Sequence, residues 1–383
     1  MTFTLAFVDL AAWGVAGGAV LCAAVWGAIA YRRRGQRLAQ TRATCPKCLA
    51  VGMLTPSENG PSVMPRLLQC RNPSAGDGEE ECGFEFLEHY RDLPKLSFTT
   101  LGAPASGKSL WSLELYSHLL QGRYPDGVTF TRIEGPGAER FDRMVDDLLK
   151  SRMFPAATQV STLPDPIVFA FQNRNRRARL RHCLINLFDF AGEVSVRLTN
   201  ASALRRRQLQ AEGYLFFLDP TQPAQVQGEA MARFAENVSA IRQVPVGRQI
   251  DVPLAICLTK LDLLTAPPHY QPGGWVDRFY DELRAIDPSG ESLAADALEA
   301  RSNLVREVLP HLFPGWDMLR QAEAFFGRRW KLFPLTPIGL NHLNSANAGS
   351  LLERMIEPYG VCEPLLWMLD QNGAAVLPRG PTF

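Results

Sequence analysis

Three short motifs hold the residues of this chain whose types and spacing could do chemistry. Residues 102–109 have the spacing G-x-x-x-x-G-K-[ST], in which backbone N–H groups cradle phosphates, the lysine reaches their outer oxygens and the last hydroxyl ligates Mg²⁺. Residues 189–193 read Asp-Phe-Ala-Gly-Glu, and residues 259–262 read Thr-Lys-Leu-Asp. Together these motifs predict a site for a nucleoside triphosphate.

The first two motifs supply the predicted phosphate and magnesium ligands. Asp189 ends an apolar run, where a carboxylate can hold Mg²⁺ through water beside Ser109, and Gly192 leaves room for its amide to meet the γ-phosphate. Without a phosphate loop, Asp189 and Gly192 would instead be a capping residue and a turn residue. The predicted phosphate-loop residues are Gly102, Ala105, Ser106, Gly107, Lys108 and Ser109, of which Lys108 is also a candidate catalytic residue.

The third motif predicts which base is bound. Asp262 can accept hydrogen bonds from N1 and the exocyclic amine of guanine, a donor pattern that adenine does not present. Lys260 would lay its methylene stem on the base. Thr259 stands where such sites often have Asn, and its hydroxyl can still make the local hydrogen bonds. Thr336 opens residues 336–339, a candidate loop over the base, so the motif favours GTP, with ATP as the alternative.

A first switch segment is expected before the apolar run that starts at residue 167. It must supply a Thr hydroxyl that meets Mg²⁺ when the γ-phosphate is present. Thr158 and Thr162 are both available, and we favour Thr162 because a switch Thr normally precedes its strand by a few residues. The arginine-rich residues 174–181 are expected to form a hairpin tip beside the switches.

Four cysteines near the N-terminus indicate a metal site. Cys45 and Cys48 form a tight C-x-x-C turn, and Cys70 and Cys82 could complete a tetrahedral Cys₄ site for structural Zn²⁺ in a small zinc ribbon. A polar insert, residues 71–81, stands where an ordinary ribbon has its second C-x-x-C turn. The alternatives are disulfides, which a reducing cytoplasm disfavours, and unligated thiols, which the paired start disfavours.

The first segment is predicted to be a membrane anchor. Residues 10–31 carry no charge, and this run of 22 residues is long enough for a helix to cross a bilayer once. Four arginines follow it directly, so the N-terminus is expected outside and the rest of the chain on the cytoplasmic side of the inner (plasma) membrane. A buried helix of a soluble protein is the alternative. The four arginines are Arg32, Arg33, Arg34 and Arg37.

Apolar runs and helical periodicity predict an α/β fold. The phosphate loop lies between a predicted strand at 96–101 and a helix that begins after Ser109. We therefore expect a mostly parallel sheet with helices on both faces, interrupted by a helical insertion at about 263–329 with helices at 275–286 and 294–312. The further expected strands are 167–171, 183–188, 214–218, 252–258 and 332–335.

Composition adds little to these local signals. The chain has 383 residues, a 46% apolar content and a net charge of +1, which give no global argument for nucleic acid as a partner. No HExxH sequence, nucleophile elbow or dinucleotide fingerprint is present. The function is therefore expected to depend on the three motifs.

With these elements assembled, residues 102–367 resemble the translation-factor-like class of P-loop GTPases that includes Ras-like proteins. Within that class, residues 189–193, the strand ending Leu218-Asp219-Pro220 and residues 364–367 look like the bacterial double-GTPase group. The resemblance implies a GTP-binding protein with Mg²⁺. It also implies a protein partner, a second GTPase among the candidates, and a place in a bacterial conflict system.

One departure from the Ras-like pattern affects the expected rate. Ras-like enzymes place Gln after the switch glycine to orient the attacking water, whereas this chain has Glu193. The candidate catalytic residues are therefore Lys108, Thr162 and Glu193. A carboxylate beside the γ-phosphate implies slow hydrolysis that a partner accelerates. Residues 205–207, three arginines, could supply a guanidinium or be a solvated helix face. A nucleotide-binding scaffold or receptor with negligible turnover is the alternative function.

The expected domain order follows from these assignments. A membrane anchor with its basic flank occupies residues 1–37, and a zinc-ribbon-like module occupies residues 38–93. A P-loop GTPase-type domain then extends over residues 94–370, including the helical insertion, and a short tail ends the chain at residues 371–383.

Overall fold

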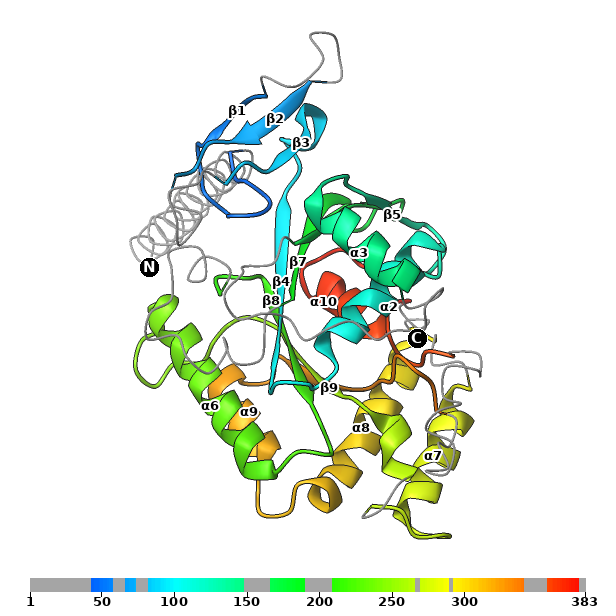
Figure 1. The fold of residues 1–383 in the computed structure, drawn as a ribbon. Coiled ribbons are helices and arrows are strands. Elements are labelled where there is room, and N and C mark those ends of the chain that lie inside the picture. The colour runs from blue at the N-terminus through cyan, green and yellow to red at the C-terminus, as the bar shows by residue number, and fades with distance from the viewer. Residues whose placement is uncertain are drawn as a thin grey trace, which may run out of the picture.

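The computed structural model describes residues 43–57, 66–73, 82–147, 166–189, 209–265, 269–288, 292–340 and 357–378. Within these ranges the chain forms an α/β body, and a small three-stranded sheet lies beyond one end of it (Figure 1). Among the described residues, no helix has the length and apolarity needed to cross a bilayer. The predicted anchor, residues 10–31, lies outside the described residues.

The body is built on a seven-stranded sheet with the order β10-β9-β8-β4-β7-β6-β5. Strands β10, β9, β8, β4 and β7 are parallel to one another, and β6 and β5 continue the sheet in antiparallel pairing. The prediction of a mostly parallel sheet is confirmed. The strands are β4 (Lys95–Gly102), β5 (Val128–Arg132), β6 (Ile167–Asn173), β7 (His182–Asp189), β8 (Gly213–Leu218), β9 (Leu254–Leu258) and β10 (Trp330–Pro334).

Helices cover both faces of this sheet, as its sequence predicts. Side chains alternate along β8, so Leu215 packs on one face with α2, α3 and α10, while Tyr214 packs on the other with α6 and α9. Helix α8 packs on the edge strand β10, and α7 packs on α8. Both helices are labelled at the lower right of Figure 1. The helices are α2 (Lys108–Leu120), α3 (Pro136–Asp146), α6 (Ala224–Ile241), α7 (Trp275–Ile286), α8 (Ala295–Leu312), α9 (Met318–Phe326) and α10 (Glu363–Gln371).

The cysteine-rich segment forms the second, antiparallel sheet, in the order β1-β2-β3. Its buried cysteines, Leu68 and Phe86 share one apolar cluster with Val168 and Ala170 of β6 and Leu184 of β7. The small sheet therefore packs directly on the strands of the larger one. Its strands are β1 (Leu54–Pro56), β2 (Leu67–Cys70) and β3 (Glu85–Leu87), and the 3-10 turn η1 (Glu88–Tyr90) follows.

The arginine-rich hairpin lies elsewhere than predicted. Residues 174–181 connect β6 to the start of β7, whereas Asp189 is the last residue of β7. Because the length of β7 separates this hairpin from Asp189, the hairpin tip lies at the opposite end of the strands from the predicted magnesium ligand. The expectation that this tip lies beside the switches is wrong.

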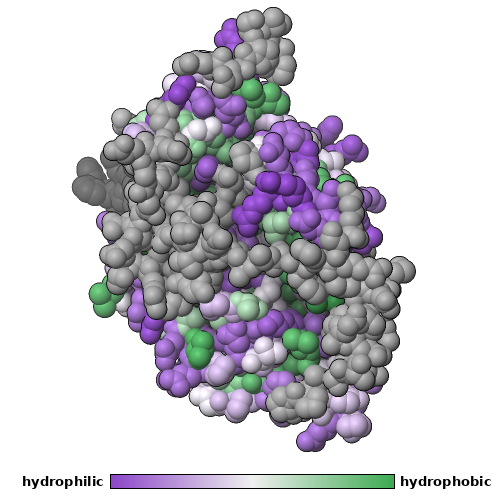
Figure 2. Space-filling model, in the orientation of Figure 1, coloured by the Kyte–Doolittle hydropathy of each residue, from purple (hydrophilic) through white to green (hydrophobic). Residues whose placement is uncertain are grey.

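Polar residues make up most of the described surface on the face shown in Figure 2, with apolar residues scattered between them. A surface of this kind is ordinary for a folded domain. It gives no argument for a broad apolar docking area on the described part of that face.

Candidate nucleotide-binding site

The phosphate loop has the backbone that its motif requires. It leaves β4 at Gly102, and helix α2 begins at Lys108 after an N-cap residue, Gly107, with a φ of 89°. Gly102 has a φ of 137°, and a Cβ atom there would lie 2.6 Å from the carbonyl oxygen of Phe217 in β8. Only glycine fits this close approach. The result is a strand, a tight loop and a helix N-terminus, the arrangement that binds phosphate.

Lys108 is folded over this loop. Its side chain is buried, and its Nζ donates hydrogen bonds to the carbonyl oxygens of Gly102 at 3.2 Å and Ala103 at 2.7 Å and to Oγ of Ser106 at 3.1 Å. These contacts hold the ammonium group over the loop. The structure thus brings Gly102 and Ser106 of the predicted loop into contact with the ammonium group of Lys108.

Asp189, the predicted magnesium ligand, is the last residue of β7, next to the strand that leads into the phosphate loop. It is paired in register with Thr100 near the end of β4, and the Thr100 hydroxyl donates to its Oδ1 at 3.2 Å. Burial raises the pKa of Asp189, while a hydrogen bond from Ser109 and the charge of Lys108 oppose that rise. Oδ2 is buried and has no hydrogen-bond partner among the described residues. A carboxylate oxygen of this kind, beside Ser109, fits the water-bridged Mg²⁺ of a phosphate site.

The base-reading motif lies directly after β9, against the phosphate loop. The Thr259 hydroxyl is 2.9 Å from the carbonyl oxygen of Ser106 and 2.8 Å from that of Leu218. It therefore makes the local contacts expected of the usual Asn, and it joins the base-reading segment to the phosphate loop. Lys260 follows with a φ of 51°, and its Nζ forms an ion pair with Asp219 at 2.7 Å.

Asp262 and Thr336 form a buried pair. The Thr336 hydroxyl donates to Oδ1 of Asp262 at 2.9 Å, and the amides of Ile338 and Gly339 donate to the same hydroxyl oxygen at 3.3 Å each. Burial raises the pKa of Asp262, and the hydrogen bond from Thr336 opposes that rise. The structure thus places the predicted loop at residues 336–339 beside the carboxylate that would read guanine.

A comparison with known protein families shows which family the chain belongs to. The family model described as double-GTPase 2 matches residues 99–306, which is more than half of the chain. The chain belongs to the double-GTPase 2 family. The matched part of this double-GTPase runs from β4 to α8 and includes the phosphate loop, Asp189 and the base-reading motif. No curated protein matches the chain.

Several predicted residues of this double-GTPase fall outside the described residues. They are the γ-phosphate sensor Gly192, the candidate catalytic residues Glu193 and Thr162, the alternative switch residue Thr158, and the arginines at 205–207. Their predicted roles stay predictions. The described residues include the phosphate loop, the predicted magnesium ligand Asp189 and the predicted base-reading pair, Asp262 and Thr336.

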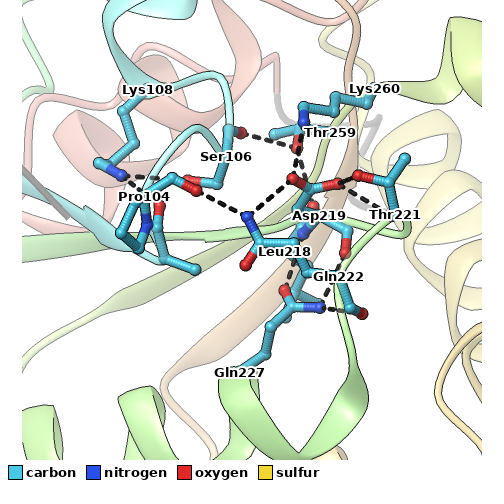
Figure 3. A network of polar contacts seen from close by, with 11 residues as sticks. Pro104, Ser106, Lys108, Leu218, Asp219, Thr221, Gln222, Gln227, Thr259 and Lys260 are labelled. Carbon is cyan, nitrogen blue, oxygen red and sulfur yellow. Dashed lines mark hydrogen bonds and ion pairs between the residues drawn. The ribbon is translucent and has the colours of Figure 1, made fainter. Parts of the chain in front are cut away.

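The structure also shows polar residues that the sequence analysis did not assign to the site. The carboxylate of Asp219 accepts hydrogen bonds from the amide and hydroxyl of Thr221, from Gln222 and from Lys260 (Figure 3). The side-chain amide of Gln227 accepts from the backbone N–H of Asp219 at 2.8 Å and donates to its carbonyl oxygen at 2.7 Å. Their signal in the sequence is the strand ending Leu218-Asp219-Pro220, which also carries part of the family resemblance.

The four predicted zinc ligands lie together at the start of this double-GTPase. The sulfur atoms of Cys45, Cys48, Cys70 and Cys82 all lie within 4.8 Å of one another, and all four residues are buried. Hydrogen bonds from the other three thiols lower the pKa of Cys48. Four converging thiols with one readily ionised fit a tetrahedral Zn²⁺ site.

The second pair of cysteines, Cys70 and Cys82, is brought together by backbone hydrogen bonds on either side of the insert. Gly83 donates its backbone N–H to the carbonyl oxygen of Cys70 at 3.0 Å, and Cys82 donates to that of Asn72 at 2.9 Å. The chain on either side of the insert is thereby paired backbone to backbone. Cys82 reaches the position of the missing second C-x-x-C cysteine even though it is distant in sequence.

Proposed function

We propose that this double-GTPase binds GTP with Mg²⁺ and hydrolyses it as a molecular switch. The contact between Thr259 and Ser106 carries the proposal, because it joins a phosphate-binding loop to a base-reading segment at one edge of the sheet. Asp189 lies at the same edge, because β7 and β4 are parallel neighbours. Sites at the carboxyl ends of parallel strands are where open α/β sheets bind nucleotides.

Each described residue then has a defined task. The amides of residues 105–107 and the Lys108 ammonium group bind the phosphates, while Ser109 and Asp189 hold Mg²⁺. The metal supplies positive charge that offsets the charge developing on the phosphate oxygens. Asp262 selects guanine through the N1 proton and the exocyclic amine, so it must be ionised, and the hydrogen bond from Thr336 favours that ionised form.

Three finer points belong to the same proposal. Turnover is slow without a partner, because Glu193 places negative charge beside the γ-phosphate. The partner is a protein, such as a second GTPase. The uncharged run at residues 10–31 anchors the chain in the inner membrane with the GTPase-type domain on the cytoplasmic side. The clustered thiols of residues 45–82 hold structural zinc. Metal analysis of the purified protein tests the zinc, and single-turnover hydrolysis separates a switch from an inert scaffold.

The base preference is the decisive test of the proposed function. Titration calorimetry with non-hydrolysable GTP, ATP and xanthosine triphosphate analogues should show tight binding of the guanine nucleotide alone. Asp262→Asn should weaken GTP and favour the xanthosine nucleotide, since the amide presents a donor where the carboxylate was an acceptor. Asp251→Asn is the matched control, because that carboxylate is exposed and paired with Arg329 away from the site. Equal binding of GTP and ATP would contradict the proposal.

A further inference from the structure

The carboxylate of Asp219 is the centre of a polar network at the end of β8 (Figure 3). The residue is fully buried, and it accepts four hydrogen bonds. Two come from Thr221, through its amide at 2.9 Å and its hydroxyl at 2.6 Å. The others come from Gln222 at 3.2 Å and from the ammonium group of Lys260 at 2.7 Å. A buried carboxylate is tolerated only when it is satisfied in this way.

The network reaches both halves of the proposed nucleotide site. Nε2 of Gln222 also donates to the carbonyl oxygen of Pro104 in the phosphate loop at 2.6 Å. Lys260 belongs to the base-reading motif, whose neighbour Thr259 contacts the same loop at Ser106. Asp219 is therefore connected to the phosphate loop through Gln222 and to the base-reading segment through Lys260.

Both connected segments hold a residue in an unfavourable backbone conformation. Lys260 has a φ of 51° and Ala105 in the phosphate loop a φ of 59°. Residues with a Cβ atom adopt this left-handed region rarely, and they remain there only where surrounding contacts fix them. The ion pair with Asp219 is such a contact for Lys260, because it fixes the direction of the side chain that leaves this strained backbone.

We propose that Asp219 is a positioning residue of the guanine-nucleotide site. Its carboxylate holds the Lys260 side chain where the base would bind. It also keeps the base-reading segment and the phosphate loop in a fixed position relative to each other. Gln227 supports this role by holding the peptide groups of Asp219 on both sides. The inference rests on the proposed function, since Lys260 needs positioning only if a base lies on it.

A double-mutant cycle in the full-length chain tests this role. The variants are Asp219→Asn, which keeps the shape and removes the charge, and Lys260→Met, which keeps an apolar stem and removes the ammonium group. Loss of a charge-assisted hydrogen bond predicts that Asp219→Asn weakens binding of a non-hydrolysable GTP analogue about tenfold. In the Lys260→Met background the same substitution should cost less than about threefold, because the partner is already gone.

Equal losses in the two backgrounds would overturn the proposal, because a residue that only stabilises the fold acts whether or not Lys260 is present. Glu229→Gln is the matched control, since its carboxylate on α6 contacts Gln225 and Arg233 at an exposed site outside the network of Asp219. If Asp219→Asn does not fold, Gln222→Ala serves instead. It should weaken the GTP analogue while leaving the unfolding temperature of the nucleotide-free protein close to that of the parent, and unchanged affinity counts against the network. Failure of the parent protein to bind guanine nucleotide would refute the proposed function rather than this inference.

Discussion

The hydroxyl of Thr336 favours the ionised form of the carboxylate that would read guanine, against the effect of burial. Thr336→Val replaces that hydroxyl by a methyl group of similar size at a fully buried position. The hydrogen bond to Oδ1 of Asp262, 2.9 Å long, is lost, and burial then acts on the pKa of Asp262 without this opposition. The pKa of Asp262 therefore rises further in the variant.

The size of the effect follows from the kind of hydrogen bond removed. A hydrogen bond to a charged group is worth about 1.5–3 kcal/mol, so its loss favours the protonated acid by about ten- to a hundredfold. A protonated Asp262 can no longer accept two hydrogen bonds from guanine. Affinity for GTP should therefore fall in both proteins as the pH decreases through the pKa of Asp262, and it should begin to fall at a higher pH in Thr336→Val.

The assay is the dissociation constant of a non-hydrolysable GTP analogue measured between pH 5.5 and 8.5. Titration of the nucleotide itself cancels in the ratio of variant to parent constants. We expect this ratio to be small at high pH and to grow as the pH falls. Thr336→Ser, which keeps the hydroxyl, should follow the parent. A ratio that stays constant with pH would refute the reasoning, because the hydroxyl would then act on loop structure alone.

Two further predictions concern the scaffold of the site. Gly102→Ala should abolish nucleotide binding and lower the unfolding temperature, because the added Cβ would lie 2.6 Å from the carbonyl oxygen of Phe217. Gly122→Ala is the control: this glycine has a φ of 72° but nothing within 4 Å of an added Cβ, so the change should cost only about 1–2 kcal/mol of stability. Similar unfolding temperatures for the two variants would contradict this prediction. Burial raises the pKa of Glu212 from 4.5 to about 7. Between these two pH values the folded protein therefore binds more protons than the unfolded chain. This carboxyl should make the fold about 1 kcal/mol more stable at pH 6 than at pH 8. Glu212→Gln should remove that contribution, and a difference between pH 6 and pH 8 as large as that of the parent in chemical denaturation would count against it.

The strands of the central sheet could be predicted because their signal is local. A parallel strand buried on both faces is a nearly continuous apolar run, and the run at 214–218 in β8 and the run at 183–188 in β7 are of this kind. The predicted start of β9 at residue 252 was two residues early, since the strand begins after Pro253, which cannot donate to the sheet. Strand β5 was not predicted, because only Val128 and Phe130 are buried and polar side chains alternate with them, so the segment has no continuous apolar run.

The contacts between strands could not be predicted from the sequence in the same way. The pairing of Asp219 with Lys260 joins residues 41 positions apart and depends on β8 and β9 lying side by side, with Leu218 paired in register with Leu258. The motifs fix what each strand end can bind, but not which strand ends are neighbours. For the cysteines, the spacing predicted that four thiols converge, but not the backbone pairing around the insert that brings Cys82 to the cluster.

The small cysteine-rich sheet packs on the strands that lead to the proposed phosphate site. Only residues 91–94 separate η1 from β4, and the carbonyl oxygen of Pro94 accepts a hydrogen bond from the amide of Leu184 in β7 at 2.7 Å. Leu184 also packs in the cluster that contains the buried cysteines. Strand β4 then leads into the phosphate loop, and β7 ends at Asp189, the proposed magnesium ligand. Because this module covers the apolar side chains of β6 and β7 on one face, it acts as part of the core of the nucleotide-binding body rather than as a separate appendage.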